Sequence, residues 1–222
     1  MGSGPTSSST IVVVAGGDAV DPAHLDPVAR EAFVIAADSG IERAAALGLR
    51  VDLAVGDFDS VDAAALEQVA AAGAEVERHP EAKDATDLEL ALDAALRRSP
   101  QRVLVVGGHG GRLDHFLANA VLLAAPRYGG VEIVAQMGEA RVTVVRSAAT
   151  LHGEPGSLVS LVPVHGGAQG VATEGLAFPL HDEDLAPGST RGVSNRMVAD
   201  VAQVRLAGGV LLAVQPGAEE ER

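Results

Sequence analysis

The chain has 222 residues, enough for one large domain or two modest ones with a buried core. Aromatic residues make up only 2% of it against 47% apolar residues, so the core must consist of valine, leucine, isoleucine and alanine. The formal charge of −14 argues against nucleic acid or an anionic membrane surface as the partner. The absence of cysteine excludes disulfides and thiolate metal sites.

The N-terminal segment lacks the features of a signal peptide, because no basic residue precedes Arg30 and the apolar run at residues 11–15 is short. No apolar run approaches the ~20 residues that a membrane helix needs. We therefore predict a cytoplasmic protein. Residues 1–9 and 218–222 are expected to be disordered tails.

The first two predicted strands are each followed by glycine or acidic residues. Residues 10–15 are rich in β-branched side chains and run into a Gly-Gly-Asp turn, which by itself indicates no more than a turn. Residues 33–37 form the second strand, Asp38 follows it, and a helix is predicted over residues 41–47.

The third strand leads into a pair of acidic residues. Residues 51–56 are largely apolar and end in a glycine, after which Asp57 and Asp59 flank Phe58. On an extended backbone, side chains two residues apart point to the same side, so the two carboxylates would share a face with Phe58 turned toward the core. Such a pair repels unless a cation lies between the carboxylates, and Mg²⁺ is the usual occupant.

A helix is predicted over residues 61–72, with Asp59 or Ser60 as its N-cap. In an alternative interpretation, Asp57 and Asp59 only cap this helix and solvate a turn. Open α/β sheets bind ligands at the carboxyl ends of their strands, so the choice depends on what the other strand ends carry. A short fourth strand is predicted over residues 75–79.

A second acidic segment precedes the next helix. Thr86, with Glu89 three residues later, forms a capping box and predicts a helix that begins at Asp87. Capping does not explain Asp84 or Lys83, which is the only lysine among sixteen basic residues. Two carboxylates and one ammonium at a helix N-terminus suit a Mg²⁺-bound polyphosphate, and we take Lys83 as a phosphate contact.

A glycine-rich loop follows the strand predicted over residues 102–106. Four of the five residues 107–111 are glycine, which lets the backbone approach a ligand closely and offers N–H groups to anions. Arg112 then adds a guanidinium fork that suits phosphate oxygens, with Asp114 beside it. A helix is predicted over residues 116–125.

After a strand predicted over residues 131–135, helical periodicity almost disappears. Short β-type segments separated by Gly and Pro follow at residues 141–146, 157–164, 171–179 and 201–214. The Gly-Gly pair at residues 208–209 predicts a hairpin, and residues 191–196 are predicted to form a turn.

This change of pattern predicts two domains. An α/β domain with a mostly parallel sheet is expected over residues 10–140, and a smaller all-β sandwich over residues 141–217.

Acidic or glycine residues follow the strands of the first domain, and these strand ends meet at one edge of the sheet. Independent turns would not be expected to repeat this chemistry, so we favour a shared site over isolated caps. The side chains expected to converge there are Asp38, Asp57, Asp59, Lys83, Asp84, Asp87, Arg112 and Asp114.

These segments together resemble the signature blocks of the thiamine pyrophosphokinase (thiamine diphosphokinase) family. The blocks are Ala37-Asp38-Ser39-Gly40, Gly56-Asp57-Phe58-Asp59-Ser60, Lys83-Asp84-Ala85-Thr86-Asp87 and Gly111-Arg112-Leu113-Asp114-His115. The Gly175-Leu176 and Ser194-Asn195 segments resemble the β domain of that family. The family usually has Asp-Gly-Gly where this chain has Asp38-Ser39-Gly40, and the chain has no tryptophan, on which some members stack thiamine.

The resemblance implies an N-terminal α/β domain, a C-terminal β-sandwich and a homodimer with active sites at the subunit interface. It implies Mg²⁺-dependent transfer of pyrophosphate from ATP to the hydroxyl of thiamine, giving thiamine diphosphate and AMP. By the resemblance, we assign Mg²⁺ to Asp57, Asp59 and Asp87, and the catalytic set adds Asp84 and Arg112. We assign the nucleotide to Lys83, Thr86, Gly111, Arg112, Asp114 and His115, and the thiamine site to Asp38, Ser194 and Asn195.

Phosphoryl-type transfer needs mainly positioning and charge neutralisation, which this set of residues would supply. Asp59 or Asp87 would accept the proton of the attacking hydroxyl, and the sequence leaves that choice open. Three alternatives remain at this point: a pyrophosphokinase of a pterin or another primary alcohol, a non-catalytic module that senses Mg-ATP, and a Mg²⁺ phosphohydrolase.

Overall fold

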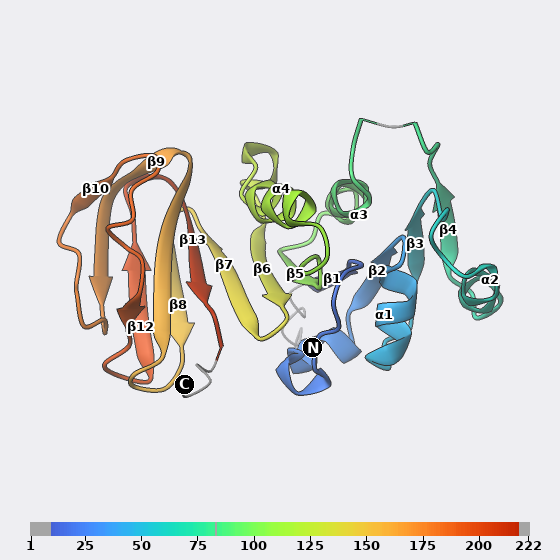
Figure 1. The fold of residues 1–222 in the computed structure, drawn as a ribbon, viewed down its shortest axis with the longest axis horizontal. Coiled ribbons are helices and arrows are strands. Elements are labelled where there is room, and N and C mark those ends of the chain that lie inside the picture. Colours follow the sequence, from blue (N-terminus) through green and yellow to red (C-terminus); the bar gives the residue numbers. More distant parts are fainter. Residues whose placement is uncertain (1–9, 83, 218–222) are drawn as a thin grey trace, which may run out of the picture. The chain divides into compact units, whose positions relative to one another are not determined.

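The computed structural model describes residues 10–82 and 84–217 (Figure 1). They form two compact units. The first runs to Asn119 and includes Gly130–Gly138, and the second comprises Ala120–Gly129 and the residues from Glu139 on.

The first unit is built on a parallel sheet whose described strands lie in the order β4-β3-β2-β1-β5-β6. Runs of Val, Ile and Ala in the inner strands are almost completely buried, as expected where helices cover both faces. The strands are β1 (Thr10–Val14), β2 (Phe33–Ala37), β3 (Leu53–Gly56), β4 (Glu75–Arg78), β5 (Arg102–Val106) and β6 (Glu132–Met137).

Helices connect these strands and cover the sheet. Helix α1 packs on β1 and β2, whereas α3 crosses β1, β2 and β3 from the opposite side to link β4 with β5 (Figure 1). The α-helices are α1 (Gly40–Ala46), α2 (Ala63–Ala71), α3 (Asp87–Leu96) and α4 (Leu113–Leu123), and the 3-10 helices are η1 (Pro22–His24), η2 (Pro27–Arg30) and η3 (Pro126–Tyr128). No helix in the described ranges is both long and apolar enough to cross a membrane.

The predicted N-cap of α3 is confirmed, but that of α2 is wrong. Thr86 caps α3 through a hydrogen bond from the Glu89 backbone N–H to its hydroxyl oxygen, at 3.2 Å. Helix α2 is capped by Asp62, whose Oδ1 accepts from the backbone N–H two residues later at 2.9 Å. The predicted caps Asp59 and Ser60 therefore lie before the helix.

Helix α4 begins at Leu113, three residues earlier than predicted. The backbone N–H of Phe116 already donates to the carbonyl of Arg112, at 3.1 Å, so the glycine-rich loop runs directly into the first helical turn. Asp114 lies in that first turn, where the helix dipole favours an acidic side chain.

The second unit is an antiparallel β region. Strand β9 is its longest described strand, with 17 residues, and it pairs with β13 along one part and with β12 along another. The strands are β7 (Ala140–Val145), β8 (Ala148–His152), β9 (Leu158–Glu174), β10 (Glu183–Leu185), β11 (Asn195–Arg196), β12 (Val201–Arg205) and β13 (Gly208–Gln215).

Two predictions for this region are wrong, and two strands were missed. The predicted hairpin at residues 208–209 does not form, because β12 pairs with β8 and β9, whereas β13 pairs with β7 and β9. The segment predicted at residues 157–164 and the first four residues of the one predicted at 171–179 belong to a single strand, β9, which bends at the glycines within it. Strands β8 and β10 were not predicted. The predicted turn at residues 191–196 is present and ends in β11.

Candidate active site

An open cleft of about 700 Å³ lies in the first unit, at the carboxyl ends of its central strands. This volume is within the usual range for small-molecule sites. The residues of our predicted site that line it are Asp38, Asp57, Asp59, Asp84, Thr86, Asp87, Gly111, Arg112 and His115. Lys83 lies outside the described residues.

The cleft opens where the strand order reverses, between β1 and β5, which is the usual position of ligand sites in such sheets. Two glycine turns meet there: the N–H of Gly108 donates to the carbonyl of Gly16 at 2.8 Å, and that of Asp18 to the carbonyl of His109 at 2.9 Å. A Cβ at Gly17 would come within 2.2 Å of the His109 carbonyl oxygen. The Gly-Gly turn after β1 is therefore required for the close approach of the two loops.

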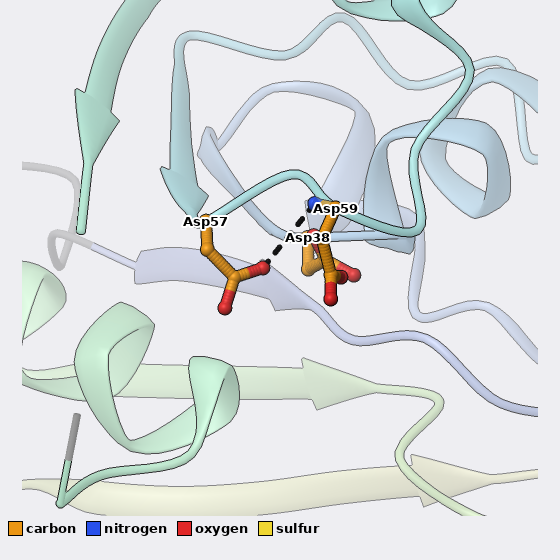
Figure 2. Close-up of side chains that lie close together, drawn as sticks. All are labelled: Asp38, Asp57 and Asp59. Carbon is orange, nitrogen blue, oxygen red and sulfur yellow. Dashed lines mark hydrogen bonds between the residues drawn. The ribbon is translucent and has the colours of Figure 1, made fainter. Parts of the chain in front are cut away.

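Three carboxylates gather in this cleft from the loops after β2 and β3 (Figure 2). Asp38, Asp57 and Asp59 each contribute one oxygen to a group whose members lie within 4.8 Å of one another. Carboxylate oxygens are the ligands that Mg²⁺ and Ca²⁺ prefer. Asp38, which we had assigned to the substrate, thus lies with the acid pair, whereas Asp87 lines the same cleft outside this group.

Asp57 and Asp59 come together by a different backbone geometry from the extended one that we expected. Strand β3 ends at Gly56, and Phe58 adopts a left-handed conformation with φ 60°. The Asp59 N–H turns back to Oδ1 of Asp57, at 3.3 Å (Figure 2). Phe58 is buried, as predicted, at 8% exposure. Burial of this ring fixes the tight turn that carries the two acids.

Asp38 is buried, at 8% exposure, and its two carboxylate oxygens differ. Oδ2 accepts a hydrogen bond of 2.6 Å from the Ser60 hydroxyl. Oδ1 is inaccessible to solvent and has no hydrogen-bond partner among the described residues. Burying an ionised oxygen without a partner is unfavourable, so this atom is suited to a cation.

This chain has Ser39 at the position where the family usually has the first glycine of Asp-Gly-Gly, and the local structure accommodates the serine. Ser39 has ordinary right-handed backbone angles, φ −59° and ψ −5°, so glycine is not required there. Its hydroxyl fits because Gly16 opposite has no side chain: a Cβ on Gly16 would lie 2.2 Å from the Ser39 oxygen.

Arg112 and Asp114 form an exposed ion pair, with 2.6 Å between Nη2 and Oδ2. The hydrogen bond from Arg112 lowers the pKa of Asp114 to about 2. The same pairing raises the pKa of Arg112. Arg112 lines the cleft. Asp114 therefore orients the guanidinium.

The two residues assigned to thiamine from the β region, Ser194 and Asn195, lie in the second unit. The amide of Asn195 is buried and joined to the backbone of Phe178, with Nδ2 donating to its carbonyl at 2.7 Å and Oδ1 accepting from its N–H at 3.0 Å. Ser194 is exposed and adopts a left-handed φ of 58°. Their roles toward the substrate stay predictions.

Sequence reasoning missed several residues of the cleft. Ser60 was expected only as a helix cap, and Asn119 was not considered, although its Nδ2 donates to the carbonyl of Gly108 at 3.0 Å and fastens the glycine loop to α4. Glu81 and Phe116 also line the cleft. The signal for Asn119 was its place on the helix that follows a glycine loop.

Comparison with known proteins agrees with this geometry. The family model for the thiamin pyrophosphokinase catalytic domain matches residues 26–135, and that for the thiamin pyrophosphokinase vitamin B1 binding domain matches residues 147–211. The chain is 28% identical to thiamine pyrophosphokinase of Bacillus subtilis (strain 168) over 217 residues, which covers 93% of this chain and 98% of the relative.

Solved structures give the same result. The crystal structure of thiamine pyrophosphokinase from Bacillus subtilis matches with a TM-score of 0.81 and 27% identity, covering 95% of this chain and 100% of that chain. The enzyme from Geobacillus thermodenitrificans matches with a TM-score of 0.79 and 25% identity, covering 96% and 99%. With both domain models matched in order and the fold shared over the whole length, this chain belongs to the thiamine pyrophosphokinase family.

Proposed function

We propose that this chain is a Mg²⁺-dependent thiamine pyrophosphokinase that converts ATP and thiamine into AMP and thiamine diphosphate. Family membership supports the reaction, and one structural observation carries the assignment of the site: three carboxylates that share a cleft at the strand ends. In the reaction the thiamine hydroxyl oxygen bonds to the β-phosphorus of ATP, and the bond from that phosphorus to the α-phosphate oxygen breaks. AMP leaves with that oxygen, and the hydroxyl proton passes to a base.

The residues of the cleft fit Mg²⁺. Asp38, Asp57 and Asp59 provide oxygen donors, and the unpartnered Oδ1 of Asp38 matches the need of a hard cation for such ligands. Mg²⁺ bound there would neutralise phosphate charge and hold the polyphosphate in place. We keep Asp87 in the proposed set as a further ligand from the N-terminus of α3, since it lines the same cleft.

The nucleotide phosphates would be bound on the other side of the cleft by the glycine loop and Arg112. The loop lets its backbone lie close to a ligand, and the fork of Arg112 suits phosphate oxygens. Asp114 keeps this fork oriented, and Lys83 remains a proposed phosphate contact. Either Asp59 or Asp87 would accept the hydroxyl proton.

Incubation with ATP, Mg²⁺ and thiamine, followed by mass detection, tests the reaction. We expect thiamine diphosphate and AMP in equal amounts, and at least a tenfold lower rate for Asp57→Asn, a loss of about 1.4 kcal/mol in transition-state stabilisation. AMP formed only with a pterin alcohol, or phosphate released to water in place of AMP, would refute the thiamine assignment. ATP binding without any product would refute catalysis itself.

We propose that the protein is a homodimer, as the family resemblance implies. Apolar side chains recur every four residues along α4 and are exposed: Leu113 at 69%, Leu117 at 54% and Val121 at 43%. Such a stripe on a surface helix suits an interface, and we assign it to a second copy of this chain. Leu117→Asp should lower the mass measured by light scattering to that of a monomer, whereas Ala118→Asp on the same helix should not. An unchanged dimer in Leu117→Asp would exclude this helix as the interface.

A further inference from the structure

Ser60 donates the hydrogen bond that orients Asp38, although the two residues are 22 positions apart in the sequence. The Ser60 hydroxyl lies 2.6 Å from Oδ2 of Asp38, the short distance typical of a hydroxyl bonded to an ionised carboxylate. Ser60 is itself exposed and lines the cleft, and Asp62 rather than Ser60 caps α2. Its hydroxyl is therefore not needed to start the helix.

The backbone of Asp38 is fixed independently of this hydrogen bond. Its N–H donates to the Val55 carbonyl at 2.9 Å, and its carbonyl accepts from the N–H of Ile41 at 3.1 Å. Its φ of 46° is left-handed, a conformation that persists in a non-glycine residue only when the surroundings enforce it. Gly56 packs against it so closely that a Cβ there would lie 3.2 Å from both Cα and Cβ of Asp38.

With the backbone fixed, the rotation of the carboxylate is the remaining degree of freedom. We propose that Ser60 is a positioning residue, which holds Oδ2 of Asp38 so that the carboxylate presents its other oxygen to a divalent cation shared with Asp57 and Asp59. Among the described residues, Ser60 is the donor to this carboxylate, and Oδ1 is left without a partner. The inference rests on the proposed function, because the cation is the one that the transfer requires.

A metal-ligating carboxylate that is itself hydrogen-bonded needs no reorientation when the ion arrives. Without the Ser60 hydroxyl, the Asp38 carboxylate would populate other rotamers, and the ion would bind only to the fraction that is correctly oriented. The loss should therefore appear as weaker metal binding. A direct contact between Ser60 and the substrate would instead raise the KM for ATP or thiamine and leave metal binding unchanged.

The test measures Mn²⁺ binding to the full chain without nucleotide, by electron paramagnetic resonance of free Mn²⁺. We expect Ser60→Ala to raise the Kd for Mn²⁺ about tenfold, which is the lower end of the loss in metal affinity when the hydrogen-bond partner of a metal ligand is removed. Ser60→Thr should restore the Kd of the unsubstituted chain. The matched control is Val61→Ala, which removes apolar packing next to Ser60 and leaves the polar groups and charges of the cleft intact. In turnover assays, Ser60→Ala should raise the Mg²⁺ concentration for half-maximal rate by a similar factor, while kcat at saturating Mg²⁺ changes less than threefold.

The outcomes separate this inference from the proposed function. If the unsubstituted chain binds Mn²⁺ and forms thiamine diphosphate but Ser60→Ala binds Mn²⁺ within twofold of it, only the role of Ser60 is overturned. The role of Ser60 is likewise overturned if Val61→Ala weakens Mn²⁺ binding as much as Ser60→Ala does, or if Ser60→Thr does not restore Mn²⁺ binding. If the unsubstituted chain binds no Mn²⁺, both the proposed metal site and the role of Ser60 are overturned. If metal binding follows our expectation but no product forms, the proposed reaction is wrong and the positioning role stands.

Discussion

Replacing Asp38 by asparagine should stabilise the metal-free protein and remove its response to Mg²⁺. The substitution keeps the shape of the side chain and an oxygen that can accept from Ser60. Asparagine also tolerates the left-handed φ of 46° at this position better than most residues. The charge of the carboxylate is therefore the main property that changes.

The size of the effect follows from the spacing of the cluster. The three carboxylate oxygens lie within 4.8 Å of one another, so the substitution removes two of three repulsive pairs. At that separation each pair costs at least about 0.9 kcal/mol, the value in a water-like dielectric, and more where Asp38 is buried, so at least about 2 kcal/mol is relieved. Replacing a charge-assisted hydrogen bond by a neutral one loses about 1 kcal/mol. The net gain is therefore at least about 1 kcal/mol, which raises the Tm of a chain of this size by about 2–4 °C or more.

Thermal unfolding of both proteins, in EDTA and in excess Mg²⁺, measures this effect. In EDTA the Tm of Asp38→Asn should exceed that of the unsubstituted protein. In Mg²⁺ the unsubstituted protein should gain stability by mass action, while the variant gains little. The difference in Tm between the two proteins should therefore narrow or reverse. Asp62→Asn, which removes a charge at the start of α2 and keeps the cap of that helix, serves as the control. It should change neither the Tm in EDTA nor the gain in Tm on adding Mg²⁺. A variant that is less stable in EDTA yet responds normally to Mg²⁺ would show that Asp38 is a structural residue and not a metal ligand.

Three further predictions test other parts of the site. Thr86→Ala should cost about 1 kcal/mol of unfolding free energy in urea titrations, because α3 loses its cap, and Thr86→Ser should keep most of it. Gly17→Ala should cost at least about 1 kcal/mol, because its φ of 106° disfavours a side chain and its Cβ would meet the His109 carbonyl; an unchanged urea midpoint would contradict the close approach. The carboxyl carbon of Asp114 should titrate near pH 2 in NMR, since Arg112 lowers its pKa. The pairing with Arg112 should therefore be fully present above the usual carboxyl pKa and lost only as the pH falls through about 2; Arg112→Gln should return that pKa toward its usual value.

Elements that depend on local chemistry could be predicted from the sequence. Strands β2 and β5 match their predicted bounds, because β-branched and small apolar runs end abruptly in an acid or a glycine. The N-cap at Thr86 also holds, since Thr86 and Glu89 lie within one helical turn. The convergence of acids at the strand ends follows from the parallel order of the strands.

Features set by distant partners could not be predicted in the same way. Asp59, Ser60 and Asp62 are all good caps within four positions, and local propensity does not choose among them. Ser60 bonds to Asp38, which reaches it only through the pairing of β2 with β3. Asp38 and not Asp87 joins the close group of carboxylates. This too depends on distances in the folded chain, which the spacing of residues in the sequence does not reveal.

The hairpin predicted at residues 208–209 failed for a related reason. A Gly-Gly pair between two apolar runs is a good local signal for such a turn. In the folded unit, however, β9 is long enough to pair with β13 along one part and with β12 along another, so the two runs do not pair with each other. Long-range pairing thus overrides the turn signal.

Diffraction from crystals grown with Mn²⁺ and a non-hydrolysable ATP analogue would locate the cation directly through its anomalous signal. We predict a peak within bonding distance of oxygens from Asp38, Asp57 and Asp59, with a phosphate oxygen of the analogue completing its ligands. An ordered cation bound elsewhere in the cleft, with the three carboxylates left free of metal, would contradict the site described above.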